Sequence, residues 1–318
     1  MNRDYLKNKW LTIENDRREG EFKILRYFSD PETRLFLAID EKENRAIIIY
    51  SDNINSIDRL PVEKENVNLL IKDDAVILLL TNPGYQDVFD DLVLSISSTI
   101  KKEEQIEKHL SLFIYKYTEW ATFFRNGSSK LSFEQLMGLY GELIILRDNL
   151  LSENQFTHYK ILSSWKGPSG SVHDFVFDEY DLEVKTKLYR TATVNISSKY
   201  QLEPVEDRQL ILSVVNLLLD DSEGKALSSL IISIREILSA SNSDISPLYK
   251  ALSYFDITME TSFEYDNFRF ILHSVDMYDT TMVDFPKLVT SNLIPGISSV
   301  KYKIETKSIQ SFKITKTD

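Results

Sequence analysis

The sequence predicts a mixed α+β protein, in which a β-rich N-terminal module precedes a larger core of strands and helices. Short runs of β-branched and aromatic residues alternate with turn residues over residues 9–98. Apolar residues recur at helical spacing over residues 87–125 and again over 133–150. Residues 209–219 form a largely apolar run, which is typical of a central strand buried on both faces. We therefore expect a mixed sheet flanked by helices in the core.

Length and composition fit either two domains or one large elaborated domain with a sizeable core. The chain has 318 residues, of which 42% are hydrophobic and 27% charged, and this balance favours a globular protein over a disordered one. The clearest internal break is the polar stretch Arg-Asn-Gly-Ser-Ser at residues 125–129. We expect residues 1–125 to form the N-terminal module, ending in helices, and residues 126–318 to form the core.

The residue types exclude several classes of site. The chain has no cysteine, which excludes disulfides and thiolate zinc sites, and its 4 histidines are too dispersed for a zinc motif. The longest apolar run, residues 210–219, is too short to span a membrane, and the N-terminus lacks the apolar centre of a signal peptide. We expect a cytoplasmic protein without a membrane partner.

The N-terminal module is predicted to contain five strands joined by turns rich in glycine, proline and asparagine. The strands cover residues 21–28, 33–39, 45–49, 67–71 and 74–80. The helical stretch that follows ends in the aromatic residues Trp120, Phe123 and Phe124, which we interpret as core. No catalytic constellation is found in this module, so we expect it to serve recognition or assembly.

A helix is predicted from Phe133 to about residue 150. Ser132 is the expected N-cap, and Gln135 three residues later completes a capping box. Glu142 lies inside this helix among apolar residues, so it either turns to solvent or needs a metal or basic partner. Gly138 and Gly141 each cost about 1 kcal/mol in a helix interior, which indicates close packing against a neighbouring element.

Residues 171–187 are predicted to form a β-hairpin around which the core is organised. Two strand-like runs, 172–177 and 182–186, flank a polar cluster at 178–181. With the turn centred on Glu179 and Tyr180, Asp174 is expected opposite Lys185 and Val176 opposite Glu183. A slip of one residue would move the side chains to opposite faces.

Three polar side chains of this hairpin are expected on one face, because side chains alternate along a strand. They are Asp174, Glu183 and Lys185. Diagonal neighbours lie about 7–8 Å apart, so the two carboxylates can share one hard cation such as Mg²⁺, with the lysine ammonium beside them. The alternative interpretation is a solvated face that carries an ordinary cross-strand ion pair.

The remaining elements of the core are predicted from short apolar runs. Strands are expected at residues 159–163, 193–196, 209–219, 268–275 and 300–304, and helices at 226–238 and 246–255. Residues 197–202 are expected to form a short turn or helix that ends before Pro204.

The charge distribution is uneven. The formal net charge is −12, which argues against strong non-specific binding to nucleic acid. Residues 184–202, however, contain four cations and no acid, and the C-terminal residues 301–316 carry five lysines with one glutamate. These segments form either a local basic surface beside the hairpin or an ordinary solvated face.

An ordered set of short motifs resembles one bacterial protein family. The set comprises Gly141-Glu142-Leu143, Trp165-x-Gly167-Pro168, His173-Asp174-Phe175, Leu182-Glu183-Val184-Lys185-Thr186, Ile196-Ser197-Ser198 with Gln201-Leu202, Phe285-Pro286-x-Leu288, Ile294-Pro295-Gly296-Ile297 and Val300-x-Tyr302. In this order the motifs resemble the bacterial PD-(D/E)XK family proteins, which are related to restriction endonucleases. The resemblance covers roughly residues 131–312 and, more loosely, the N-terminal part.

The resemblance implies a restriction-endonuclease-like fold with the active site on the hairpin and the preceding helix. Carried over residue by residue, Glu142, Asp174 and Glu183 would hold one or two Mg²⁺ ions, with Mn²⁺ as a substitute, and Lys185 would be the catalytic lysine. The residue before Asp174 is His173 instead of the proline in the family name. His173 is then either a phosphate contact or a structural histidine.

Five further residues are candidates for weak contacts with nucleic acid. They are Lys187, Arg190, Ser198, Lys199 and Gln201. Ser198 and Lys199 either contact the DNA backbone or belong to a loop held by ordinary hydroxyl hydrogen bonds. Gln201 lies where related nucleases place a polar residue.

The function expected from these observations is a Mg²⁺-dependent DNA endonuclease of a bacterial restriction or phage-defence system. A homodimer is expected, because each strand of a duplex must meet one active site. One alternative is a non-catalytic or weakly catalytic DNA-binding or assembly subunit that works beside a methyltransferase or a helicase/ATPase. Another is a nuclease with the same chemistry that acts on RNA or on branched structures.

Overall fold

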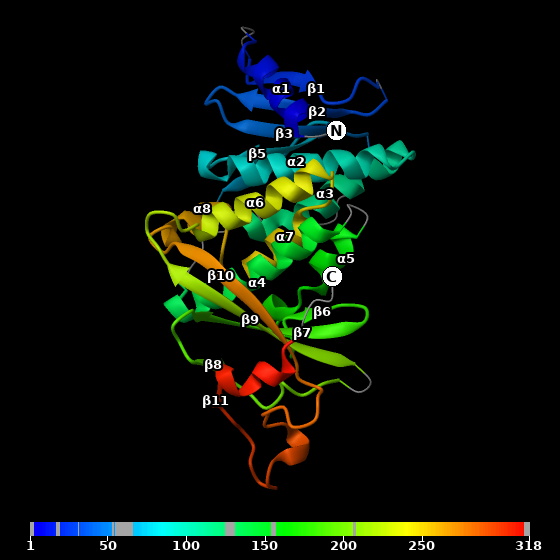
Figure 1. Ribbon diagram of the computed structural model, residues 1–318. Coiled ribbons are helices and arrows are strands. Elements are labelled where there is room, and N and C mark those ends of the chain that lie inside the picture. Colours follow the sequence, from blue (N-terminus) through cyan, green and yellow to red (C-terminus); the bar gives the residue numbers. More distant parts are fainter. Residues whose placement is uncertain are drawn as a thin grey trace. The chain divides into compact units, whose positions relative to one another are not determined.

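The chain folds into two compact units. The computed structural model describes residues 3–16, 20–30, 32–52, 54, 66–124, 131–153, 157–205 and 208–314. The first unit comprises Met1–Ser128 and Leu238–Thr261, and the second comprises Ser129–Ile237 and Ser262–Asp318. A segment from the C-terminal half of the sequence therefore belongs to the N-terminal unit. Together the elements make a mixed α+β protein, which confirms the predicted fold class (Figure 1).

The first unit is built on a five-stranded antiparallel sheet in the order β1-β2-β3-β5-β4. Its strands are β1 (Phe22–Arg26), β2 (Leu35–Asp40), β3 (Arg45–Tyr50), β4 (Val67–Lys72) and β5 (Ala75–Leu80). Each of the five matches a segment that the sequence predicts as a strand, to within one residue at its C-terminal end for β2, β3 and β4. Alternating apolar residues and Gly, Pro and Asn turns both favour hairpins there. Apolar side chains on one face form a core cluster that includes Ala38, Ile48 and Ile77.

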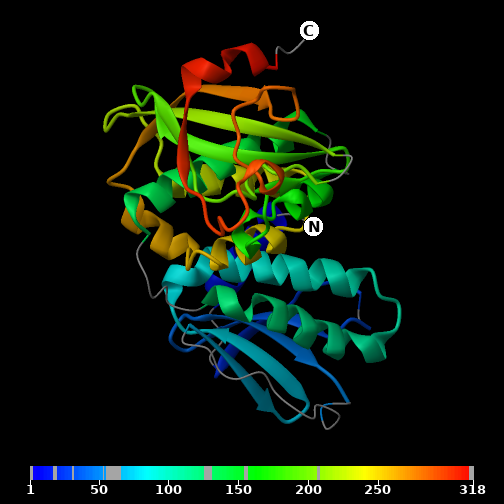
Figure 2. The ribbon, with the colours of Figure 1, turned by 90° about the horizontal axis from the view of Figure 1, so that it is seen from below.

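Helices complete the first unit. They are α1 (Arg3–Glu14), α2 (Gln86–Lys101), α3 (His109–Trp120), α7 (Ser246–Ser253) and the start of α8 (Met259–Ser262). Figure 2 shows α2 and α3 packed side by side next to the sheet. The aromatic residues Trp120 and Phe124 are fully buried, as the sequence predicts. Helix α1 is not anticipated from the sequence, because its apolar stripe consists of only Leu6, Trp10 and Ile13.

The second unit contains a mixed four-stranded sheet in the order β10-β9-β7-β6. The strands are β6 (Phe175–Val176), β7 (Tyr180–Leu188), β9 (Gln209–Leu219) and β10 (Phe270–Asp279). β7 and β9 are parallel, whereas the outer pairs are antiparallel. Strand β9 lies between two neighbours and is buried along most of its length, so the predicted central strand is confirmed. A separate antiparallel pair joins β8 (Thr193–Ile196) to β11 (Tyr302–Glu305).

The two faces of this sheet pack differently. On one face, Leu212 and Val214 of β9 join an apolar cluster with residues of β8, β11 and the C-terminal segment η8 (Thr306–Phe312). Glu183 and Lys185 pair with Leu212 and Val214 in the parallel ladder, so their side chains share this face. The other face of β7, which carries Thr186, packs on α4 (Phe133–Ser152).

Helix α4 begins as its sequence predicts. The Ser132 hydroxyl accepts a hydrogen bond from the Gln135 N–H at 3.2 Å, and the Gln135 side chain accepts one from the Ser132 N–H at 2.9 Å. This capping box satisfies two of the main-chain donors that every helix start leaves unpaired. Helix α6 (Leu227–Ala240) is also found where the sequence predicts a helix, and its last residues belong to the first unit.

One predicted strand is wrong. Residues 159–163 lie in helix α5 (His158–Ser164), which packs on α4. A run of five residues is too short for its apolar period to distinguish a strand from a helix. The contact that orients this helix is tertiary, since the His158 ring bonds the Leu150 carbonyl oxygen at 3.0 Å. Among the described residues, no helix has the length and apolar character needed to cross a membrane.

Candidate active site

The hairpin that carries the candidate site has a different register from the predicted one. β6 pairs with β7 so that Phe175 faces Leu182 and Val176 faces Asp181, and the Phe177 N–H donates to the Tyr180 carbonyl at 3.0 Å. The pairing is therefore shifted by two residues, which places Asp174 opposite Glu183 instead of Lys185. A shift of two leaves every side chain on its predicted face, because side chains alternate with a period of two.

Asp174 is held at the start of the hairpin by main-chain contacts. Its Oδ2 atom accepts a hydrogen bond from the Val184 N–H at 2.7 Å, which ties it to β7. Its carbonyl oxygen accepts hydrogen bonds from the N–H groups of Lys166 and Gly167, at 2.7 and 2.9 Å. These three contacts fix both the main chain and the carboxylate, as a site residue requires.

Glu183 and Lys185 are neighbours on the same face of β7. Glu183 is 1% exposed, and its Oε1 atom lies 2.6 Å from the Lys185 ammonium, whose side chain is 16% exposed. The second carboxylate oxygen of Glu183, Oε2, is buried and has no hydrogen-bond partner among the described residues. An unpaired buried carboxylate oxygen is costly, so this atom is a candidate ligand for a cation.

Glu142 reaches the hairpin from helix α4. Its Oε2 atom accepts a hydrogen bond from the indole N–H of Trp165 at 2.7 Å. Gly167 lies between this residue and Asp174, since a Cβ atom built on Gly167 would be 2.8 Å from Glu142 Oε2 and also 2.8 Å from Asp174 Oδ1. Both oxygens lie within 2.8 Å of one point, so they are at most about twice that distance apart. The absence of a side chain at Gly167 thus lets the two carboxylates approach.

The pKa values of all three carboxylates are raised, chiefly by burial. Burial raises the pKa of Glu142 well above its usual range, and the nearby charge of Asp174 adds to this effect. Burial also raises the pKa of Asp174, while the Lys185 charge and the Val184 N–H oppose the rise. The pKa of Glu183 rises from its usual 4.5 to about 8, because the group is buried and faces the Asp174 charge. A cluster of this kind needs added positive charge to be fully ionised near neutral pH.

The residue types fit a divalent metal ion, which prefers carboxylate oxygens. Three observations support the fit: the unpaired Glu183 Oε2, the space at Gly167 between two carboxylate oxygens, and the raised pKa values that a cation would lower. The side chains are not converged on one point, however. Within the residues that the structure describes, no group of three His, Asp or Glu side chains is arranged to hold a metal ion.

The His173 side chain is buried and contacts a buried aspartate, so its surroundings indicate a structural role. Its ring Nδ1 lies 3.0 Å from Asp181 Oδ2, and both residues are buried. Asp181 also accepts hydrogen bonds from Arg208, at 2.7 and 3.0 Å. The three side chains join the start of β6 to β7 and to the residue before β9.

The candidate nucleic-acid residues are found in different environments. Lys187 is buried, which lowers its pKa, and its ammonium donates to the Thr191 carbonyl at 2.7 Å. The Gln201 side chain accepts the Ser197 N–H at 2.7 Å and so closes the turn after β8. The Lys199 ammonium lies over the Tyr200 ring, 5.1 Å from its centroid. Ser198 is partly exposed and Arg190 is exposed.

Trp165 and Gly167 contribute to the site although the sequence analysis assigns them no role there. Trp165 is 5% exposed and stacks on Phe175 with ring centroids 6.4 Å apart. Its main chain also forms an antiparallel bridge with Phe175. The available sequence signal is the segment Trp-x-Gly-Pro at residues 165–168, shortly before the hairpin, which predicts a tight turn next to the strand.

The chain matches a known family along most of its length. The family is described as "Putative PD-(D/E)XK family member", and the match covers residues 6–307. No curated protein and no solved structure matches the chain.

Proposed function

Because the chain belongs to the PD-(D/E)XK family, we propose that it is a metal-dependent nuclease that hydrolyses phosphodiester bonds in DNA. The observation that carries this proposal is an acidic group at the hairpin, where Glu142 and Asp174 meet at Gly167. Glu183 lies beside Lys185 on the face that Asp174 shares. Three carboxylates with raised pKa values beside a lysine form an unusual group for a purely structural site.

Each side chain has a distinct role in this proposal. Asp174, Glu183 and Glu142 would hold Mg²⁺ or Mn²⁺. The bound ion would supply Lewis-acid stabilisation of the phosphate and a water of lowered pKa. Lys185 is partly exposed and its ammonium is positioned by Glu183, so it can orient the attacking water and stabilise negative charge on the phosphate oxygens.

Two hydrogen bonds to the carboxylates of the site support precise positioning. The Val184 N–H orients Asp174, and the Trp165 indole orients Glu142. Each contact uses one oxygen of its carboxylate, Asp174 Oδ2 or Glu142 Oε2. The other oxygens, Asp174 Oδ1 and Glu142 Oε1, accept neither of these hydrogen bonds. Those oxygens stay available for a cation, which fits a site whose ligands are arranged in advance.

The biological setting that fits this chemistry best is a bacterial restriction or phage-defence system. We propose a homodimer, because each strand of a duplex must meet one active site. A methyltransferase or a helicase/ATPase is the expected type of partner in such a system.

The second candidate is a non-catalytic or weakly catalytic DNA-binding or assembly subunit. The net charge of −12 favours this function, because an acidic protein binds DNA weakly by itself. The side chains of the described residues are also not converged into a metal site. A nuclease acting on RNA or branched structures would use the same residues and differ only in substrate.

The test is a plasmid-cleavage assay with and without Mg²⁺ or Mn²⁺. Lys185→Ala and Asp174→Ala should each lower the cleavage rate by on the order of 100-fold or more. The matched control is Lys225→Ala, which removes an exposed lysine of the same unit. Circular dichroism should show an intact fold for all three variants. Duplex, single-stranded and branched substrates should be compared to identify the preferred nucleic acid.

Two outcomes would count against a nuclease. One is a cleavage rate that Lys185→Ala leaves unchanged. The other is an absence of cleavage together with a melting temperature that Mg²⁺ raises no more in the wild type than in Asp174→Ala. The second outcome would favour the assembly subunit, and co-purification with a partner would then support it.

A further inference from the structure

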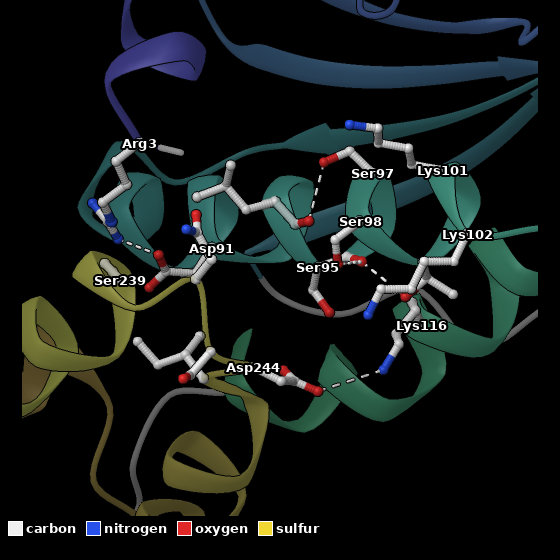
Figure 3. Close-up of a pocket in the computed structure, with 15 residues that line it drawn as sticks. Arg3, Asp91, Ser95, Ser97, Ser98, Lys101, Lys102, Lys116, Ser239 and Asp244 are labelled. Carbon is white, nitrogen blue, oxygen red and sulfur yellow. Dashed lines mark hydrogen bonds and ion pairs between the residues drawn. The ribbon is translucent and has the colours of Figure 1, made fainter. Parts of the chain in front are cut away.

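A polar cavity of about 690 Å³ lies in the first unit, whereas the candidate active site belongs to the second (Figure 3). Its walls come from α2, α3 and the connection between α6 and α7, with Arg3 of α1 at one end. The volume falls within the range of roughly 300–1,000 Å³ that small-molecule sites occupy.

One face of α2 supplies much of the cavity wall. Asp91, Ser95, Ser98 and Lys102 follow one another at intervals of four, three and four residues, which places them on the same side of a helix. The opposite side carries the apolar residues of the core, including Leu92, Val93, Ile96 and Ile100. The polar face therefore remains available to line a cavity.

The lining carries more positive than negative charge, although the whole chain has a net charge of −12. Its cations are Arg3, Lys101, Lys102 and Lys116, and its acids are Asp91 and Asp244. Arg3 pairs with Asp91, which also accepts a hydrogen bond from Tyr249 at 2.6 Å. Both acids are thus engaged by partners within the unit.

Lys102 and Lys116 present ammonium groups to the same space. Lys102 is exposed and forms no ion pair with any residue that the structure describes. Lys116 is 14% exposed, with its ammonium 2.9 Å from Glu119 and 3.9 Å from Asp244. Figure 3 shows both ammonium groups and the Ser95 hydroxyl directed toward one region of the cavity.

The turn after α6 adds further hydroxyl groups to the wall. Asn242 adopts a left-handed conformation with φ of 53°, which asparagine tolerates better than most residues. This conformation closes the helix end, where the Ser243 N–H donates to the Leu238 carbonyl at 2.9 Å and the Asn242 N–H to the Ser239 carbonyl at 3.1 Å. Ser239 and Ser243 consequently both line the cavity.

We propose that this cavity binds a small ligand with a diphosphate group, of the size of a nucleoside diphosphate. The Lys102 ammonium, which has no ion-pair partner among the described residues, can bind a phosphate, and serine hydroxyls can donate to phosphate oxygens. Lys116 lies beside it and can add a second contact, although it already pairs with Glu119 and Asp244. The described lining residues include no aromatic side chain that could stack on a base, so the phosphates supply the recognition. Residues of α1, α2, α3 and the α6–α7 connection surround the cavity. A small molecule fits such an enclosed space better than a rigid nucleic-acid duplex.

The experiment is isothermal titration calorimetry of the full chain with pyrophosphate, ADP and adenosine. Pyrophosphate and ADP should bind saturably, and adenosine should not bind. Comparable affinities for pyrophosphate and ADP would identify the diphosphate group as the part that the cavity recognises. Tighter binding of ADP than of pyrophosphate would indicate that the natural ligand is a nucleotide. Lys102→Glu should weaken binding about tenfold or more, because it removes a charge-assisted contact and adds repulsion.

Three variants make the result specific. Ser95→Asp places a negative charge on the same wall and should also weaken binding. Lys7→Glu, an exposed site on α1 outside the cavity, changes the net charge equally and should leave binding unchanged. Glu183→Gln, which alters only the candidate active site, should also leave binding unchanged, so this test is independent of the nuclease proposal.

The proposal would be overturned by any of three results. The first is no saturable binding of pyrophosphate or ADP at millimolar concentration. The second is an equal loss of affinity in Lys102→Glu and Lys7→Glu, which would indicate a general charge effect. The third is that Lys102→Glu weakens binding of a short DNA duplex but not of the small ligands, which would make this wall part of a nucleic-acid interface.

Discussion

The indole N–H of Trp165 lies 2.7 Å from Glu142 Oε2, so a residue of the turn before the hairpin fixes a carboxylate of helix α4. The same turn donates two main-chain N–H groups to the Asp174 carbonyl oxygen. The turn therefore links the two elements that supply the acidic cluster. Loss of this link should affect the site before it affects the fold.

Trp165→Phe should lower cleavage about tenfold while the protein stays folded. Phenylalanine keeps the ring that stacks on Phe175 but removes the N–H that opposes the rise in the Glu142 pKa. Cleavage should be measured against metal concentration, with a higher concentration required by the variant. The matched control is Trp120→Phe in the first unit, because the Trp120 N–H has no partner among the described residues. Equal effects of both substitutions would contradict a role for the Trp165 hydrogen bond.

Gly167→Ala should abolish most cleavage with little loss of stability. The new Cβ atom would lie 2.8 Å from both Asp174 Oδ1 and Glu142 Oε2, which are the ends of side chains that can move aside. Displacement of site groups by about 1 Å can cost on the order of 100-fold in rate. Thermal melting and plasmid cleavage should be measured together, and a fully active Gly167→Ala would show that the two carboxylates do not need to approach each other.

Glu183→Gln should raise the melting temperature at pH 8 and leave it nearly unchanged at pH 5, in buffer with a chelator. The pKa of Glu183 is about 8 in the folded protein and 4.5 in its usual state. The folded state therefore holds a proton that the unfolded state releases, and this contribution to stability is lost as the pH rises from 4.5 through 8. The cost of ionisation is on the order of a few kcal/mol, or a shift of about 5 °C or more.

The Glu183→Gln variant has a neutral side chain and therefore has no cost of ionisation at position 183. Glu179→Gln, on the exposed hairpin turn, is the control and should give the same pH profile as the wild type. A wild-type and a Glu183→Gln profile that run parallel from pH 5 to 8 would show that Glu183 ionises normally.

Gly141→Ala should destabilise the second unit by about 1–3 kcal/mol. A Cβ atom at Gly141 would overlap the Thr186 side chain, whose Oγ1 lies 1.9 Å from the position it would take. Thr186→Ala should restore stability in the double variant, which a double-mutant cycle in urea would measure. Gly138→Ala on the same helix meets nothing within 4 Å and should stabilise by about 0.5–1 kcal/mol. An equal response at the two glycines would contradict the close packing of α4 on β7.

The sequence alone predicts the elements whose cause is local. The capping box at Ser132 and Gln135 depends on residues three apart, and both of its hydrogen bonds are found. The shared face of Asp174, Glu183 and Lys185 follows from the strand period, and it survives the wrong register because the shift is an even number of residues. The buried strand β9 is also predicted, because its continuous apolar character is a property of the local sequence.

Contacts between distant residues decide the rest. The two glycines of α4 look alike in the sequence, yet only Gly141 faces a strand at close range, because helix rotation is set by packing. Residues 159–163 form a helix because α5 packs on α4, although the run is short enough for either structure.

The sequence determined the local features of this protein, and the tertiary structure decided the contacts between distant segments. Local periodicity and capping determined the five strands of the first unit, the start of α4 and the faces that these elements bury, since those effects depend on residues a few positions apart. Only the tertiary structure joined Trp165 to Glu142, brought residues 238–261 into the first unit and formed the cavity beside Lys102. Such contacts link segments 20 or more residues apart, and their energies depend on packing that no local pattern encodes.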